Sequence, residues 1–149
     1  MNQDNRNQMM DIISKNSYYY DFNQQEKRRE LYTENANTGM WMAGEQIYNH
    51  HSYDEFIERQ TARRNMLERR GVTPRHYNTD FLFESVSDDL GKCRVMILTT
   101  WQEKDRRGPR LIHSGYCDFE FVRSVNGWKI SRRVLYIDHK RPPPNVTNV

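Results

Sequence analysis

The chain has 149 residues, of which 36% are hydrophobic, 29% are charged and 12% are aromatic, and its formal net charge is +3. This length predicts one domain with a single core, and the polar composition predicts that aromatic side chains form much of that core. A small polar domain often gains further burial by association, so we expect a homo-oligomer, a dimer or a trimer.

The basic residues are spread along the chain and mixed with acidic ones. Arginine doublets recur at five places, namely Arg28-Arg29, Arg63-Arg64, Arg69-Arg70, Arg106-Arg107 and Arg132-Arg133. A protein that binds nucleic acid concentrates its cations on one face. We therefore interpret the doublets as solvated faces and ion pairs, and expect no nucleic-acid partner.

The two cysteines and the N-terminal residues bear on the compartment. Cys93 and Cys117 lie in apolar stretches, at a spacing that fits neither a metal site nor a disulfide framework. Buried free thiols in a reducing compartment fit best. Residues 1–6 have no apolar signal core, and no apolar run approaches membrane-spanning length. We expect a cytoplasmic protein with no membrane partner.

Two helices are predicted near the start of the chain. Residues 1–7 are polar and predict a frayed start. Apolar residues recur at helical spacing over residues 8–20, which predicts a helix. Asn23, with Glu26 three residues later, has capping-box spacing and predicts the start of a short second helix that ends near Thr33.

A short hairpin and a longer helix come next. Residues 38–43 predict a first short strand, which turns at a glycine and pairs back with residues 46–48. Ser52 and Glu55 form a better capping box, which predicts a helix over residues 53–70. A glycine directly after this helix is its natural stop.

The second half predicts a meander of antiparallel strands. These strands are expected at residues 75–86, 92–103, 109–123 and 128–138. The Asn126-Gly127 pair is a strong hairpin signal, because it readily adopts positive φ. Helices followed by a meander predict an α+β fold, with the helices packed on a strongly curved mixed or antiparallel sheet that forms a cone. We expect one domain over residues 1–141 and an extended proline-rich tail over residues 142–149.

Strand alternation sorts the side chains onto two faces. On the third long strand the apolar face carries Leu111, His113, Gly115, Cys117, Phe119 and Phe121. We expect this face, and therefore His113, to point inward. On the last strand Trp128, Ile130, Val134 and Tyr136 share one face with Arg132, and because both faces are mixed, either could be covered. On the first long strand the face of His76 and Asn78 either points to solvent, which the alternation taken alone favours, or lines a polar patch within a pocket.

Three stretches of the second half carry a resemblance to known proteins: Pro74–Thr79, Gly115–Arg123 and Asn126–Arg133. The pattern is a strand led by His, a Gly-Tyr-x-Asp strand, and a Gly-Trp-(Lys/Arg)-Ile-x-Arg-Arg strand closed by Asp. It resembles SnoaL-like members of the nuclear transport factor 2-like superfamily. It also resembles the β subunits of aromatic-ring-hydroxylating dioxygenases, which share the fold. The helical first half is similar in layout only.

The resemblance implies a cone-shaped, usually oligomeric protein. The enzymes of the family work by acid–base chemistry on hydrophobic small molecules, and most need no metal or organic cofactor. Several dehydratase-like members use an Asp from the loop after the first helix with a His from the first long strand. Asp21 and His76 match those two places here. This match favours turning the His76 face inward.

The sharpest hypothesis is therefore a catalytic pair. His76 would act as general base, because an imidazole titrates near neutral pH, and Asp21 would orient its ring and stabilise the imidazolium. The alternative for His76 is a structural histidine hydrogen-bonded at a helix–sheet junction. The alternative for Asp21 is a turn or helix-cap carboxylate.

Four further residues are candidates for substrate binding. Tyr20, from the run Tyr18–Tyr20, would donate to a developing enolate, and Asn78 would hold a substrate oxygen. His113 is a candidate second acid, and Trp41 is a candidate pocket wall. Each has a plainer alternative: a packed tyrosine, an exposed asparagine, a satisfied core histidine and a core tryptophan.

Two features narrow these expectations. Scytalone dehydratase has a second His on the strand that here contains Gly115, with His113 one inward position earlier, so scytalone dehydration in particular is not expected. His50-His51 has no third ligand at metal spacing, so we expect no metal site. The resemblance likewise implies no cofactor.

We expect a cofactor-independent isomerase, dehydratase or cyclase acting on a polyketide, terpenoid or steroid-like compound. The alternative is a non-catalytic β subunit or binding module of the same fold. An enzyme requires an open cone with Asp21 and His76 within hydrogen-bond reach. A β subunit requires a large apolar interface and a pocket closed by its own aromatic residues.

Overall fold

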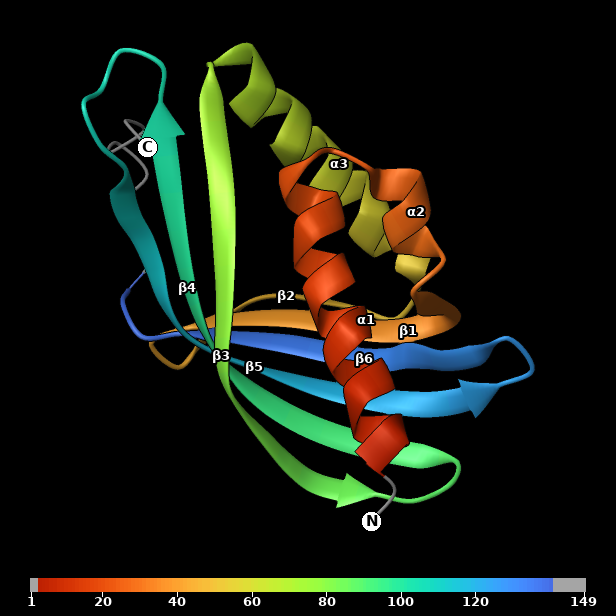
Figure 1. Ribbon diagram of the computed structural model, residues 1–149. Helices are drawn as coiled ribbons and strands as arrows, with labels where there is room; N and C mark the ends of the chain where they lie inside the picture. Colours follow the sequence, from red (N-terminus) through yellow and green to blue (C-terminus); the bar gives the residue numbers. More distant parts are fainter. Residues whose placement is uncertain (1–2, 141–149) are drawn as a thin grey trace.

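Three helices and six strands make up the computed structural model, which describes residues 3–140 (Figure 1). The elements are α1 (Gln3–Asp21), α2 (Gln25–Arg29), β1 (Tyr32–Met42), β2 (Glu45–His50), α3 (Tyr53–Arg69), β3 (Val72–Val86), β4 (Leu90–Glu103), β5 (Arg110–Ser124) and β6 (Gly127–Ile137). The strands form one sheet in the order β2-β1-β6-β5-β4-β3. β1 and β6 run parallel, and the other neighbouring strands are antiparallel. The prediction of an α+β fold with a mixed sheet is confirmed.

The sheet is strongly curved, and the helices lie on its concave side (Figure 1). α1 crosses this side, and the long strands β3 and β4 bend sharply beneath it. Register shifts interrupt the ladders between β3 and β4, between β4 and β5, and between β5 and β6. Bulges of this kind bend a strand and increase its twist. The bulges therefore account for the concavity that the helices cover.

The first helix is longer than the sequence indicated. Helix α1 already includes residues 3–7, where a frayed start was expected. Asn23 is not the N-cap of α2, because Gln24 holds that position without a side-chain cap, and Asn23 has φ 54° at the end of α1. Asparagine tolerates this left-handed conformation. The Asn23 side chain donates to the carboxylate of Glu68 over 2.8 Å and so ties the end of α1 to α3.

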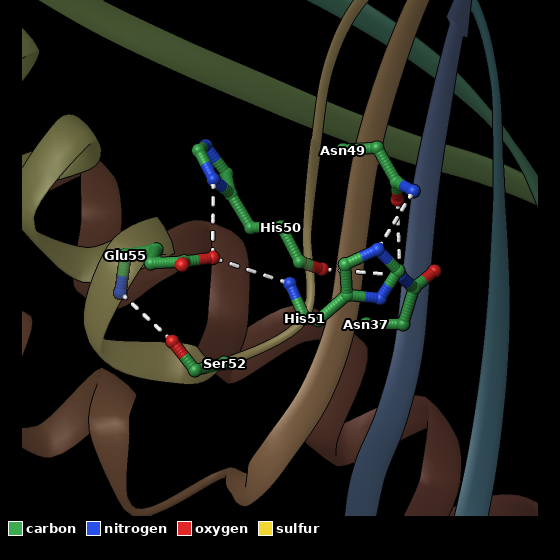
Figure 2. Close-up of polar contacts among 6 residues, drawn as sticks. All are labelled: Asn37, Asn49, His50, His51, Ser52 and Glu55. Atoms are coloured by element: carbon green, nitrogen blue, oxygen red, sulfur yellow. Dashed lines mark hydrogen bonds and ion pairs between the residues drawn. The ribbon is translucent and has the colours of Figure 1, made fainter.

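The start of α3 follows the predicted capping box (Figure 2). Ser52 Oγ accepts from the backbone N of Glu55 over 3.3 Å, and Glu55 Oε2 accepts from the backbone N of His51 over 3.3 Å. The two histidine rings face different partners: His50 Nδ1 lies 3.5 Å from Glu55 Oε2, whereas the His51 ring lies against Asn37 and Asn49. Within residues 3–140 no group of three or more His, Cys, Asp or Glu side chains is arranged to hold a metal ion.

The inward face of the sheet forms the main core. Cys93, Val95, Ile97, Thr99 and Trp101 alternate into it from β4, and Cys117, Phe119 and Phe121 do so from β5. The face of β3 that carries His76 also points inward, because His76 pairs with the buried Thr99. The resemblance predicted this orientation, and alternation alone predicted the opposite.

Two predictions about strand faces are wrong beyond a bulge. A register shift between β5 and β6 changes the alternation within β6, so Arg133 and Leu135 face the interior after Trp128 and Ile130. Val134 and Tyr136, which were grouped with Trp128, lie on the opposite face. Leu111 is 61% exposed rather than buried, beyond the register shift between Thr99 and Thr100.

The convex face of the sheet carries a row of large side chains in register. Trp41 pairs with Tyr136, Tyr136 with Tyr116, and Tyr116 with Met96. The Tyr116 and Tyr136 rings stack with centroids 4.7 Å apart. Trp41 thus lies on the face opposite to the helices.

Three further expectations concern the two cysteines, the membrane and the C-terminal tail. Cys93 and Cys117 are free and buried, as predicted, and burial raises the pKa of their thiols to about 12 and about 11. No helix in residues 3–140 combines the length and apolar character needed to cross a membrane. The expected tail, residues 142–149, lies outside the described residues, so the domain boundary stays a prediction.

Candidate active site

A cavity of about 730 Å³ opens between the helices and the concave face of the sheet. Its walls come from α1, α2 and α3 and from the inward faces of all six strands or the segments next to them. Its apolar lining includes Met40, Met42, Ile47, Leu67, Trp101, Ile112 and Leu135. Its polar lining includes Ser17, Tyr20, Gln60, His76, Thr99 and His113. The cavity is large enough for a small organic molecule.

Asp21 and His76 meet at one wall of this cavity. His76 Nδ1 lies 2.6 Å from Asp21 Oδ1, and the backbone N of His76 donates to Asp21 Oδ2 over 2.9 Å. The Asp21 side chain is 6% exposed and the His76 side chain 17% exposed. Because a carboxylate only accepts hydrogen bonds, Nδ1 carries a proton in this contact. The neutral ring then presents an unprotonated Nε2, which has no hydrogen-bond partner among the described residues.

Local structure places both residues of this pair. Asp21 is the last residue of α1, and its backbone carbonyl accepts from Arg64 Nη2 of α3 over 3.1 Å. Asn78, two residues after His76 on β3, donates to Ser17 Oγ of α1 over 2.9 Å. Two neighbouring inward positions of β3 therefore hold the end of α1 against the sheet. The Tyr20 ring meets the His76 ring edge-on, with centroids 5.3 Å apart.

The structure places the four predicted substrate-binding residues in three different ways. Tyr20 and His113 line the cavity. Asn78 is turned to Ser17, which itself lines the cavity. Trp41 lies outside the cavity, because its neighbours Met40 and Met42 take the inward positions of β1. The prediction that Trp41 forms a wall of the pocket is therefore wrong, because its side chain points to the opposite face of β1.

The two cavity residues in this set differ in their titration. Burial raises the pKa of the Tyr20 hydroxyl, so the group stays protonated at neutral pH. Burial first, and the neighbouring His139 second, lower the pKa of His113 to about 4. His113 Nδ1 lies 3.0 Å from His139 Nε2, and the two rings stack with centroids 5.2 Å apart. His113 is therefore uncharged near neutral pH, the range in which an acid–base enzyme works.

Buried arginines are the residues that sequence reasoning missed. Arg28 is 2% exposed, Arg64 is 8% and Arg133 is 7%, although each belongs to a doublet that was interpreted as solvated. Their doublet partners behave as expected where ion pairs form: Arg29 pairs with Asp54, and Arg132 pairs with Glu120. For the strand doublet Arg132-Arg133, alternation indicated that one of the two arginines faces the interior, but not which one.

Known proteins agree with this architecture. The SnoaL-like domain family matches residues 3–134, and the chain belongs to that family. No curated protein sequence matches the chain significantly.

Solved structures share the fold at low sequence identity. ActVI-ORFA from Streptomyces coelicolor superposes with a TM-score of 0.74 at 15% identity, covering 90% of this chain and 95% of its own. The β subunit of the benzoate 1,2-dioxygenase from Burkholderia mallei ATCC 23344 gives 0.70 at 12% identity, covering 87% and 88%. An NTF2-like protein with a cystatin-like fold from Novosphingobium aromaticivorans gives 0.73 at 14% identity, covering 95% and 86%. These similarities establish the nuclear transport factor 2-like fold.

Proposed function

We propose that the chain is a cofactor-independent acid–base enzyme, an isomerase, dehydratase or cyclase that acts on a hydrophobic small molecule in its cavity. The observation that carries the proposal is the 2.6 Å contact between His76 Nδ1 and Asp21 Oδ1 beside a cavity of about 730 Å³. Family membership supports the same class of chemistry.

In this proposal His76 Nε2 removes a proton from a carbon next to a substrate carbonyl. The electrons of the broken C–H bond move into an enolate, and the imidazolium that forms is stabilised by the Asp21 carboxylate. The Tyr20 hydroxyl donates a hydrogen bond to the enolate oxygen. The proton then returns to another carbon, which gives isomerisation, or to a hydroxyl that leaves as water, which gives dehydration.

The rival proposal is a non-catalytic β subunit or binding module of the same fold. The likeness to a dioxygenase β subunit supports it at the level of the fold. The lined, open cavity favours the enzyme, because a subunit that serves only for assembly has no use for an accessible histidine paired to a buried carboxylate. The enzyme is therefore the better supported of the two.

The test is solvent exchange of an activated C–H bond. 2-Tetralone, an aromatic ketone with acidic α-protons, is incubated in D₂O with the protein, and loss of the α-proton signal is followed by NMR. We expect His76→Ala to lower the catalysed exchange rate about 100-fold or more, because the general base is lost. Asp21→Asn should lower the rate as well, because the amide no longer fixes the ring.

His51→Ala is the matched control. His51 is an exposed histidine whose ring contacts Asn37 and Asn49, away from the cavity lining. Its substitution should leave the exchange rate within about twofold, since surface changes of this kind are close to neutral. Equal rates for His76→Ala and the parent protein would refute the proposed role of His76.

We also propose that the chain forms a homodimer or homotrimer through the convex face of the sheet. Tyr77, Met96 and Leu98 are 40–49% exposed there, beside the stacked Tyr116 and Tyr136 rings. Exposed apolar patches of this kind mark association surfaces. Light scattering coupled to gel filtration would show a multiple of the 18.1 kDa chain mass. The cytoplasmic location remains a prediction, which fractionation of cells would test.

A further inference from the structure

Positively charged side chains predominate among the charged residues that line the cavity. Five arginines line it, Arg28, Arg59, Arg63, Arg110 and Arg133, together with three histidines, and no aspartate or glutamate is among its lining residues. Arg110 is paired with Glu103. None of the ion pairs within residues 3–140 involves the other four arginines. Four of the five lining arginines therefore have no carboxylate partner among the described residues, and the cavity is cationic.

Arg28 and Arg133 are the most deeply buried of these arginines, at 2% and 7% exposure. Arg28 Nε donates to Asn16 Oδ1 over 2.8 Å, but its Nη1 is buried without a hydrogen-bond partner among the described residues. The Nε of Arg133 is likewise buried without a hydrogen-bond partner among the described residues. Their guanidinium carbons lie 5.0 and 5.9 Å from the centroid of the same ring, that of Phe56.

Buried cations of this kind require an explanation. Taking a guanidinium out of water is costly, and proteins normally repay that cost with a carboxylate and with hydrogen bonds for the N–H groups. The aromatic contacts of Arg28 and Arg133 offset only part of this desolvation cost, because a cation–π attraction is much weaker than a buried ion pair. The unpartnered N–H groups recover none. The missing partner is an anion, and both side chains face a cavity that can hold one.

We propose that the cavity binds an anionic substrate, an aromatic or polycyclic carboxylate, whose carboxylate is held by Arg28 and Arg133. The planar N–H fork of arginine matches the two oxygens of a carboxylate. The apolar walls formed by Met40, Met42 and Leu135 receive the carbon skeleton. This inference deepens the proposed function and rests on it in one respect, namely that the cavity is the substrate site.

Tyr20 connects the anion site with the candidate base. Its ring lies 5.1 Å from the Arg28 guanidinium carbon and 5.3 Å from the centroid of the His76 ring. A carboxylate bound at Arg28 thus lies one aromatic ring away from His76. The anchored end of the substrate would orient the rest of the molecule along Tyr20, so that its reacting carbon meets Nε2.

The test compares 1-naphthoate with its neutral analogue 1-naphthamide by calorimetry. We expect the parent protein to bind the carboxylate roughly tenfold or more tightly than the amide, because charged hydrogen bonds are lost in the amide. Arg133→Met should remove this preference, and Arg133→Lys should restore part of it. Arg132→Met is the matched control, because Arg132 is the adjacent arginine and pairs with Glu120 on the convex face; it should retain the preference.

Each other outcome overturns the proposal. Equal binding of naphthoate and naphthamide does so, as does binding of neither, and as does an unchanged preference in Arg133→Met. The melting temperature of the empty protein is a second measurement. Arg133→Met should melt at an equal or higher temperature, because an unpaired buried charge is removed. A fall of several degrees would mark Arg133 as structural and would contradict the proposal.

The experiment separates this proposal from the proposed enzymatic function. His76→Ala should retain the preference for naphthoate, since His76 holds no part of the carboxylate. If His76→Ala exchanges 2-tetralone as fast as the parent protein while naphthoate binds as described, the acid–base role fails and the anion site stands. If exchange depends on His76 but the carboxylate preference is absent, the anion site fails alone.

Discussion

The two faces of the same sheet treat arginine in opposite ways. On the convex face Arg94 binds Asp118 through two hydrogen bonds of 2.7 and 2.8 Å, and Arg132 and Lys92 both approach Glu120, at 3.5 and 3.4 Å. On the concave side Arg133 of β6 lies in the interior, and Arg28 of α2 contacts the same Phe56 ring; none of the ion pairs within residues 3–140 involves either of them. In the single chain the first group of charges is exposed to solvent, whereas the second is enclosed by the protein.

This contrast separates structural charge from charge that is available to a ligand. A pair on a solvated surface is satisfied before any ligand arrives and adds little stability. A buried cation facing a cavity keeps its attraction for an anion that enters. Asp21 is also buried, but both of its carboxylate oxygens already accept hydrogen bonds from His76, so it is not available to a ligand. The one carboxylate at the cavity wall is therefore already hydrogen-bonded, whereas several of the arginines that line the cavity have no carboxylate partner among the described residues.

The largest expected effect tests how closely the concave side is packed. At Gly115 an added Cβ would lie 1.9 Å from the backbone O of Tyr136 and 3.1 Å from Ile137 Cα. Since backbone atoms cannot move aside cheaply, Gly115→Ala should lower the free energy of unfolding by at least about 3 kcal/mol, measured by urea denaturation.

The neighbouring residue offers a matched control for this change. Ser114 has the opposite orientation on β5 and donates to Asp138 Oδ2 over 3.0 Å. Ser114→Ala should cost about 1 kcal/mol, the value of one hydrogen bond. Equal costs for the two alanines would show that β5 and β6 separate easily at Gly115. The same close approach leaves no room for a histidine side chain at position 115.

A smaller effect concerns pH. The pKa of His113 is lowered to about 4, against an ordinary value of 6.5. The unfolded chain therefore binds a proton at this residue more readily, so the stability contributed by neutral His113 is complete above pH 6.5 and is lost as the pH falls toward 4. The loss should be on the order of 2 kcal/mol, allowing for partial exposure of the ring.

His113→Asn isolates this contribution. The fall in melting temperature between pH 7 and pH 4.5 should be smaller in the variant than in the parent protein, because the residue that must be protonated is gone. Identical pH profiles would mean that His113 titrates at its ordinary pKa and is not desolvated in the cavity.

The smallest expected effect belongs to the convex face. Arg94→Met removes the pair with Asp118, and since the Arg94 side chain is 41% exposed, the cost should be about 0.5 kcal/mol. High salt should reduce the difference between the two proteins. A cost of several kcal/mol would place this pair in a desolvated setting and would weaken the contrast between the faces.

The sequence predicted the architecture well, because its signals are local. Hydrophobic alternation and the Asn126-Gly127 turn predicted the four long strands to within a few residues at each end. The capping box at Ser52 predicted the start of α3 correctly. The resemblance also matched Asp21 with His76, which lie 55 positions apart in the chain and which the fold brings into contact.

The remaining features depend on three-dimensional neighbours. A bulge reverses strand alternation beyond it, so the faces of Arg133 and Val134 could not be assigned from periodicity. Asn23 satisfied a capping-box spacing but was needed in the left-handed turn that ends α1. Whether an arginine finds a carboxylate is decided by packing, so Arg28 and Arg133 could not be distinguished from their solvated neighbours.

The most direct test of the central claim is the tautomer of His76, read by long-range ¹H–¹⁵N NMR on the ¹⁵N-labelled protein, with His76→Ala used to assign the signals. We predict that the neutral ring carries its proton on Nδ1, where it donates to Asp21, and presents a bare Nε2 to the cavity. In Asp21→Asn this preference should weaken. A neutral ring protonated on Nε2 in the parent protein would contradict the account, because no base would then face the substrate.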